Sequence, residues 1–114
     1  MIVLINAQRA TAGIAPLGAQ SCPDGYAEPW SPRMAAAGGL SHQSIGTILS
    51  GCGARAAAEN VGMTSDQSPD ALMALFMGSP EHRANILRPS LRGVGVGAHR
   101  DAHGVWWVTQ DFVG

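Results

Sequence analysis

The sequence predicts a single domain of the α+β class, and two observations support this. Signals for helix starts and stops recur between residues 1 and 87, whereas residues 93–112 alternate with the period of two that strands require. The chain has 114 residues, of which 46% are apolar and 13% charged, a composition typical of a folded domain with a buried core. No internal repeat or low-complexity segment suggests a second unit.

The charge pattern excludes several classes of function. The net charge is −1, and the seven basic residues are all scattered arginines, so we expect no basic face for phosphates and no nucleic-acid binding. The absence of lysine excludes Schiff-base chemistry. No apolar run approaches the ~18 residues of a membrane span. The segment Met1–Ile5 lacks a charged leader and a cleavage site, so it is not a signal peptide, and the chain is either cytosolic or begins inside a longer precursor.

Helix signals come first along the chain. Residues 1–12 are compatible with a helix that Gly13 stops. The prolines and glycines of residues 14–25 predict a connection. From Tyr26 the apolar residues have helical spacing as far as the two glycines at positions 38 and 39, which predict the end of the helix. Two prolines inside that stretch, at positions 29 and 32, predict a kinked helix or one that is regular only after the second proline.

The middle of the chain is less regular. Residues 44–55 predict a short helical turn followed by a loop, because three glycines interrupt the apolar positions. Residues 56–62 are ambiguous by propensity. Ser68 and the proline after it predict a helix start, and the apolar stripe that follows continues to Gly78.

The C-terminal part predicts an antiparallel hairpin, with strands at residues 93–98 and 105–112 and a turn over 99–104. Glycines leave one face of its first strand bare, so we expect close packing there by the large rings of Trp106 or Trp107 or by a helix. The side chains of Gln110 and Asp111 are predicted to be structural hydrogen-bonding groups. The two histidines of the turn, His99 and His103, are predicted to be solvated.

The two cysteines, Cys22 and Cys52, are too few for a zinc site of four thiolates. A bridge between them would close a loop of about 30 residues and stabilise the fold by roughly 3 to 4 kcal/mol in the chain-entropy model. Two buried free thiols are the alternative, and the spacing leaves both possibilities open.

The stretch from Ser79 to Leu87 carries the densest group of reactive side chains. Ser79 is typical of an N-cap and Pro80 of a first helical residue. His82 then lies in the first turn, where the positive helix end disfavours an imidazolium, so a neutral ring able to bind a metal or accept a proton is expected. The alternative is an ordinary capped helix with a solvated histidine.

Three groups from separate segments, His42, Glu59 and His82, would form a site only if the fold brings them together. Two neutral imidazoles and a carboxylate would suit zinc or another divalent transition metal. The zinc-protease, P-loop and dinucleotide motifs are absent, and Ser79 is not in a nucleophile elbow.

Six blocks of the sequence occur in the order seen in the CAP superfamily, which includes the cysteine-rich secretory proteins, venom antigens and plant pathogenesis-related proteins. The chain most resembles the bacterial secreted, SCP-like branch. The blocks are Asn6-x-x-Arg9, Leu40-Ser41-His42, Glu59-Asn60-Val61-Gly62, Ser79-Pro80-x-His82-Arg83-x-Asn85-Ile86-Leu87, Gly93-Val94-Gly95-Val96-Gly97 and Trp107-x-Thr109-Gln110-Asp111-Phe112.

The resemblance implies a three-layer α-β-α sandwich with a small antiparallel sheet, in which residues 57–62 form a strand beside the hairpin. It also implies a cleft with two histidines and two glutamates that can hold a divalent cation. His42, Glu59 and His82 match three of these positions, and Ser79 occupies the position of the second glutamate, with Phe76 in place of a tryptophan. Such a reduced set would bind a metal more weakly.

The resemblance further implies secretion, and with it a bridge between Cys22 and Cys52. It does not extend to sterol binding, because this chain lacks the insertion before His82 that is tied to sterols in eukaryotic relatives. We expect a monomer whose partner is a small molecule or extracellular ligand.

Three functions remain open at this point. The first is an extracellular module that binds a metal or small ligand without robust catalysis. The second is a hydrolase, either metal-assisted with Glu59 as base or using Ser79 as nucleophile, although an N-cap hydroxyl is expected to be committed to backbone N–H groups. The third is a scaffold in which Glu59 and both histidines only connect the layers.

Overall fold

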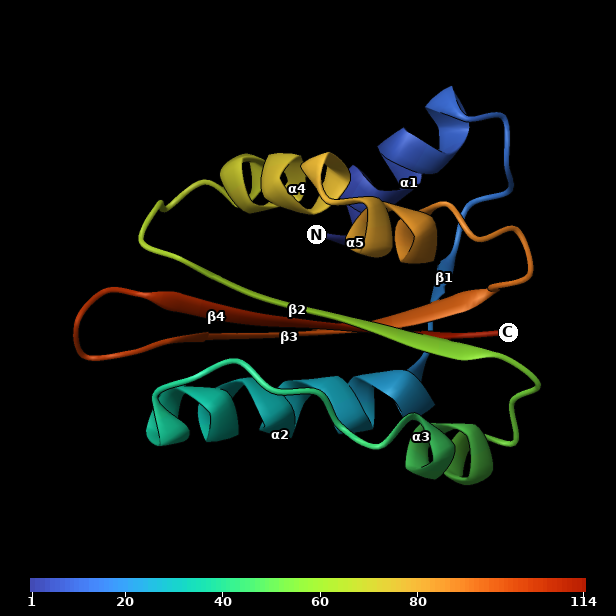
Figure 1. Cartoon of the computed structure of the whole chain (residues 1–114). Helices are drawn as coiled ribbons and strands as arrows, with labels where there is room; N and C mark the ends of the chain where they lie inside the picture. The colour runs from blue at the N-terminus through green and yellow to red at the C-terminus, as the bar shows by residue number, and fades with distance from the viewer.

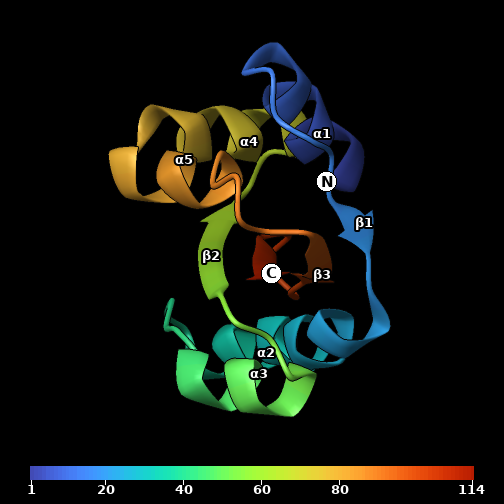
Figure 2. The same cartoon turned by 90° about the vertical axis from the view of Figure 1, so that its right-hand side faces the viewer.

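The computed structural model describes residues 1–114 and contains a β-sheet between two layers of helices (Figures 1 and 2). One layer holds α1 (Ile2–Thr11), α4 (Pro69–Gly78) and α5 (Pro80–Ile86), and the other holds α2 (Ser21–Ala37) and α3 (Ile45–Cys52). The strands are β1 (Gly18–Ala19), β2 (Ala57–Thr64), β3 (Gly93–Arg100) and β4 (Trp106–Val113). The predicted α+β class and three-layer sandwich are confirmed.

The strand order is β1-β3-β4-β2, so the hairpin formed by β3 and β4 supplies the centre of the sheet. The three long strands pair antiparallel, as expected, but β1 pairs parallel with β3 over two residues. Residues 57–62 are confirmed as a strand, and β2 lies at one edge of the sheet. In this register, Asp111 on β4 lies between Glu59 on β2 and Gly95 on β3.

The prediction of a connection over residues 14–25 is wrong at its end, because α2 begins at Ser21. Pro23 is tolerated in the first turn, where backbone N–H groups have no partner within the helix. The helix also continues through Pro29 and Pro32. The predicted alternative of a helix that is regular only after the second proline is therefore wrong. Its predicted end is confirmed, since Gly38 adopts the left-handed conformation with φ 72°.

Residues 45–52 form a helix of eight residues rather than a single turn. Ser44 caps it by accepting a hydrogen bond from the backbone N–H of Thr47. The helices predicted over residues 1–12, before Gly13, and from Ser68 to Gly78 match α1 and α4 closely. The hairpin is longer than predicted, since His99 belongs to β3 and not to the turn.

The bare face of β3 is covered by a helix, as one of the two predicted alternatives required. A Cβ atom at Gly95 would overlap the backbone of Pro23 and Asp24, and one at Gly97 would overlap the backbone of Ala27. The absence of side chains therefore lets α2 lie directly on the sheet.

Each face of the sheet has its own apolar cluster. The larger cluster lies under α1, α4 and α5 and includes Ile5, Phe76 and Phe112, whereas Met34, Val61 and Trp107 form a smaller one under α2. Cys22 and Cys52 are bridged, which ties the start of α2 to the end of α3. No helix of the protein has the length and apolar character needed to cross a membrane.

Candidate functional site

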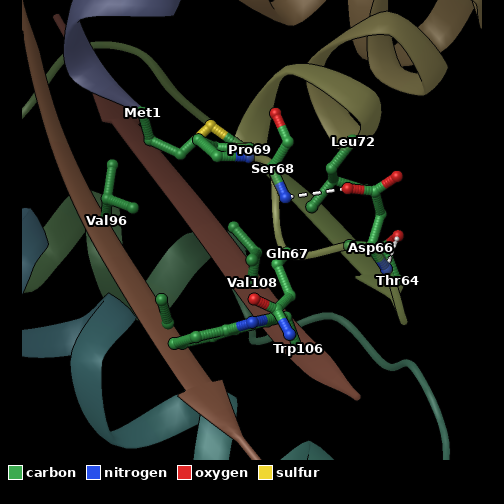
Figure 3. Close-up of a pocket in the computed structure, with 11 residues that line it drawn as sticks. Met1, Thr64, Asp66, Gln67, Ser68, Pro69, Leu72, Val96, Trp106 and Val108 are labelled. Atoms are coloured by element: carbon green, nitrogen blue, oxygen red, sulfur yellow. Dashed lines mark hydrogen bonds between the residues drawn. The ribbon is translucent and has the colours of Figure 1, made fainter. Parts of the chain in front are cut away.

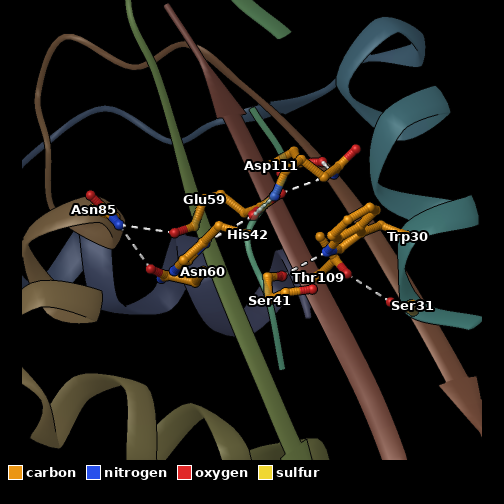
Figure 4. Close-up of polar contacts among 10 residues, drawn as sticks. Trp30, Ser31, Ser41, His42, Glu59, Asn60, Asn85, Thr109 and Asp111 are labelled. Carbon is orange, nitrogen blue, oxygen red and sulfur yellow. Dashed lines mark hydrogen bonds and ion pairs between the residues drawn. The ribbon is translucent and has the colours of Figure 1, made fainter. Parts of the chain in front are cut away.

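The candidate site is built around two consecutive residues of the edge strand β2. Successive side chains of a strand point to opposite faces of a sheet. Glu59 accordingly contacts the loop between α2 and α3, whereas Asn60 contacts α5 (Figure 4). The edge position of β2 leaves both faces of this strand close to the rim of the sheet.

On the first face, Glu59 holds the loop that follows α2. Its Oε1 atom accepts hydrogen bonds from His42 Nδ1 and from the backbone N–H of Gln43, each at 2.9 Å. Its Oε2 atom accepts a third from Gln43 Nε2, also at 2.9 Å. The Glu59 side chain is 0% exposed, whereas that of His42 is 59% exposed. Glu59 can therefore orient the imidazole of His42, but its own side chain is not accessible to solvent.

A second carboxyl group lies beside Glu59. Asp111 is fully buried, and its Oδ2 accepts a hydrogen bond of 2.9 Å from the same Gln43 Nε2. Burial raises the pKa of Asp111 to about 9, and a hydrogen bond with Glu59 and its negative charge act in the same direction. At neutral pH Asp111 is thus a neutral acid. The sequence predicted Asp111 only as a structural hydrogen-bonding group. It indicated neither the neighbouring carboxyl group of Glu59 nor the protonated state of Asp111.

On the other face, buried amides connect the sheet to α5. Asn60 Nδ2 donates to the backbone oxygen of His82 at 3.1 Å and to Gln110 Oε1 at 3.1 Å. Asn85 Nδ2 donates to Asn60 Oδ1 at 2.9 Å and to the backbone oxygen of Glu59 at 3.2 Å. These contacts fix the position of the helix that carries His82 relative to β2.

The side chain of His82 has different neighbours from that of His42. Its Nδ1 atom is 2.8 Å from Ser79 Oγ, and its ring centroid is 5.1 Å from that of Phe76. Ser79 occupies the N-cap position of α5 but makes no side-chain capping bond. The expectation that its hydroxyl is committed to backbone N–H groups is therefore wrong. The hydroxyl has the imidazole three residues later as its hydrogen-bond partner instead.

The fold divides the four predicted cleft residues between two contact sets: His42 with Glu59 on one face of β2, and His82 with Ser79 in and before α5, whose backbone contacts Asn60 from the other face. It does not assemble a ready-made metal cage, since no group of three or more His, Cys, Asp or Glu residues could hold an ion. Both imidazoles use Nδ1 for an orienting partner. No hydrogen bond joins the two imidazoles, and the buried Glu59 side chain is not available as a third ligand.

Sequence reasoning missed Gln43, Asn60 and Asn85 as members of the site. Gln43 and Asn60 directly follow His42 and Glu59, so their position beside candidate residues was a usable signal. Asn85 lies one helical turn after His82.

A cavity of about 270 Å³ lies elsewhere, between the start of α4 and the far end of the hairpin (Figure 3). Its lining is largely apolar and includes Met1, Leu72, Val96 and Trp106. Neither predicted histidine lines it, so it is separate from the candidate site.

Comparisons with solved structures agree with this fold. An extracellular protein containing an SCP domain from Bacillus anthracis is 25% identical with a TM-score of 0.82, and the match covers 98% of this chain and 38% of that one. A cysteine-rich secretory protein from Staphylococcus aureus is 20% identical with a TM-score of 0.77, covering 98% and 37%. An outer surface protein from Borrelia burgdorferi is 11% identical with a TM-score of 0.83, covering 98% and 87%.

This chain thus spans less than two fifths of the Bacillus and Staphylococcus proteins, and the two matches below 25% identity establish the fold alone. A comparison with curated protein sequences found no match. The model of the cysteine-rich secretory protein family, CAP, matches residues 2–112, which is nearly the whole chain. The chain therefore belongs to the CAP family.

Proposed function

We propose that this chain is an extracellular binding module that takes up a divalent transition-metal ion such as zinc at the edge of β2, without robust catalysis. The ligands are Nε2 of His42 and Nε2 of His82. Membership of the CAP family and the extracellular Bacillus relative support the location outside the cell.

The observation that carries the proposal is the contact between His42 and Glu59. An ionised carboxylate cannot donate a hydrogen bond, so Nδ1 of His42 carries the proton and donates to Oε1 at 2.9 Å. The neutral ring then has its lone pair on Nε2, and the side chain is 59% exposed. Histidines that bind metals are oriented in this way, by a carboxylate or carbonyl behind the ring.

His82 can present its Nε2 in the same manner if its Nδ1 donates to Ser79 Oγ, 2.8 Å away. In each ring Nε2 is then left to bind an ion, while a fixed partner holds Nδ1. Two imidazoles leave the remaining coordination positions to water, so the ion is held more weakly than in sites with three or four protein ligands. A weak, open site suits a module that recognises a ligand through the ion.

Calorimetric titration of the metal-free protein with zinc chloride tests this proposal. We expect saturable binding that the double variant His42→Ala, His82→Ala abolishes. His103→Ala is the matched control, because this exposed histidine lies in the hairpin turn and should leave binding unchanged. Absence of binding by the intact protein, or equal binding by the double variant, would overturn the metal assignment.

A hydrolase is the second candidate, and the contact between Ser79 and His82 favours it. Ser79 Oγ makes no capping hydrogen bond, and it lies within hydrogen-bond distance of the His82 imidazole, which could accept its proton. The version with Glu59 as base is weaker, because a side chain with no exposed surface cannot reach a substrate or a metal-bound water.

Profiling against peptide and ester libraries separates the two candidates. A hydrolase of this kind should show turnover that Ser79→Ala removes. Turnover that survives Ser79→Ala would rule out the serine, and absence of turnover on either library favours the binding module.

A further inference from the structure

The carboxyl groups of Glu59 and Asp111 form a pair that sequence reasoning did not recognise. The two residues lie directly opposite each other on antiparallel strands. Both side chains point to the α2 side of the sheet, where they share the side-chain amide of Gln43 at 2.9 Å each (Figure 4). Neither carboxyl group reaches solvent, because the Glu59 side chain is 0% exposed and Asp111 is 0% exposed.

The donors around this pair are divided unequally. Glu59 receives three N–H groups, two from Gln43 and one from His42. Asp111 receives only the shared amide on Oδ2, and its Oδ1 has no hydrogen-bond donor at all. A buried carboxylate oxygen without a donor is unfavourable, so Oδ1 is the atom that gains most from carrying a proton.

The surroundings offer no cation to neutralise two negative charges. The contact between His42 and Glu59 would be an ion pair only if both ring nitrogens carried protons, and the neutral ring proposed above supplies no positive charge. Adjacent buried carboxylates cannot both ionise without strong repulsion. One proton shared within the pair resolves this, and the donor pattern gives Glu59 the charge and Asp111 the proton.

We infer that Asp111 is a positioning residue for His42: as a neutral acid it donates a hydrogen bond to Glu59, and so holds that carboxylate against Nδ1 of His42. Loss of this hydrogen bond removes one of the contacts that keep the Glu59 side chain from rotating. His42 then loses the partner that fixes its tautomer and orientation. The zinc arm of the test below rests on the proposed function, whereas the arms that use the metal-free protein do not.

Asp111→Asn and Asp111→Ala make a matched pair of variants. The asparagine amide can donate to Glu59 with Nδ2 and accept from Gln43 with Oδ1, as the neutral acid does, whereas alanine can do neither. Nitrogen NMR of the His42 ring in the metal-free protein reports which nitrogen carries the proton. We expect the wild-type Nδ1–H signature to persist in Asp111→Asn and to be lost or mixed in Asp111→Ala.

The infrared spectrum of the wild-type protein tests directly whether Asp111 carries a proton. It does not depend on the folding of Asp111→Ala, in which a cavity replaces the carboxyl group. A carboxylic-acid C=O band at neutral pH, absent from Asp111→Asn, is the expected result. No such band, or a His42 signature altered as much in Asp111→Asn as in Asp111→Ala, would overturn the inference.

Zinc affinity supplies a functional readout. Outer-shell partners of metal ligands typically change affinity by about 10–100-fold, so we expect a loss of that size in Asp111→Ala and near wild-type binding in Asp111→Asn. If the wild-type protein binds no zinc but the NMR and infrared results hold, the proposed function fails and the inference stands. If zinc binds but the His42 tautomer is the same in all three proteins, the inference fails and the function stands.

Discussion

Gly95 of β3 lies directly against the backbone of Asp24 in α2, with no room between them for a side chain. This close approach brings α2 down onto the sheet and, with it, the loop that carries His42.

Gly95→Ala should destabilise the protein by about 1–3 kcal/mol or more, because the added methyl group meets backbone atoms that cannot rotate away. Gly78→Ala, at the end of α4, is the control, since a Cβ there meets nothing within 4 Å. Urea unfolding of both variants checks this. Equal stability of the two would contradict the close packing of α2.

Arg9 should be required for folding without any role in binding. It is buried, and its guanidinium donates to the backbone oxygens of Ala15, Ile86, Arg88 and Leu91. Arg9→Met leaves these acceptors unpaired at about 1–3 kcal/mol for each that remains buried. Thermal unfolding should show a large drop in Tm, whereas exposed Arg33→Met should change it little.

The stability of the protein should depend on pH through Asp111. Its pKa is raised from 3.8 in the unfolded chain to about 9 in the fold, so between these values the folded state holds a proton that the unfolded state has released. The stabilising contribution is complete below 3.8 and is lost progressively as the pH rises toward about 9. Asp111→Asn has no such proton.

The stability of Asp111→Asn relative to the wild type should therefore increase with pH. Urea unfolding of both proteins at a mildly acidic and a mildly basic pH measures the difference. A difference that stays constant between the two conditions would show that Asp111 does not change its protonation on unfolding.

The bridge between Cys22 and Cys52 should contribute roughly 3 to 4 kcal/mol in the chain-entropy model, given its sequence separation of 30. The double variant Cys22→Ser, Cys52→Ser should have a lower Tm, and a reductant should lower the Tm of the wild type but not of the variant. A reductant effect of equal size on both proteins would refute this.

Asn60→Ala separates a scaffold from a binding site. It breaks the contacts with the His82 backbone and with Gln110, so the free energy of unfolding should fall by about 1–3 kcal/mol. In a binding module the zinc affinity should fall as well, because α5 is released from β2. Lower stability with unchanged affinity would favour the scaffold.

Local signals in the sequence were enough to predict most of the helices and the hairpin. Gly13, Gly38 and Ser68 define element ends through their own conformational preferences, and the structure agrees at all three. Propensity failed at Ser21 and at residues 56–62. In both places the backbone is held by packing against distant strands, which no short window of sequence contains.

The candidate site was only partly predictable for the same reason. Resemblance identified His42, Glu59 and His82, but the partner of each is set by the fold. The Glu59 carboxylate is covered by Gln43 and Asp111, and the pairing with Asp111 depends on the register of strands about fifty residues apart. The hydroxyl of Ser79 was assigned to a cap from a statistical preference, whereas here a ring in the same turn competes for it.

The bond between Cys22 and Cys52 also makes a ring of residues 22–52, and the mostly exposed stretch 38–44 lies within it. A protease that cuts this stretch would leave both products joined, so the nicked molecule would migrate as one species until the sulfurs are separated. Under non-reducing conditions a measurement of size would therefore not detect cleavage of the loop that carries His42. The imidazole would nevertheless no longer be held in place.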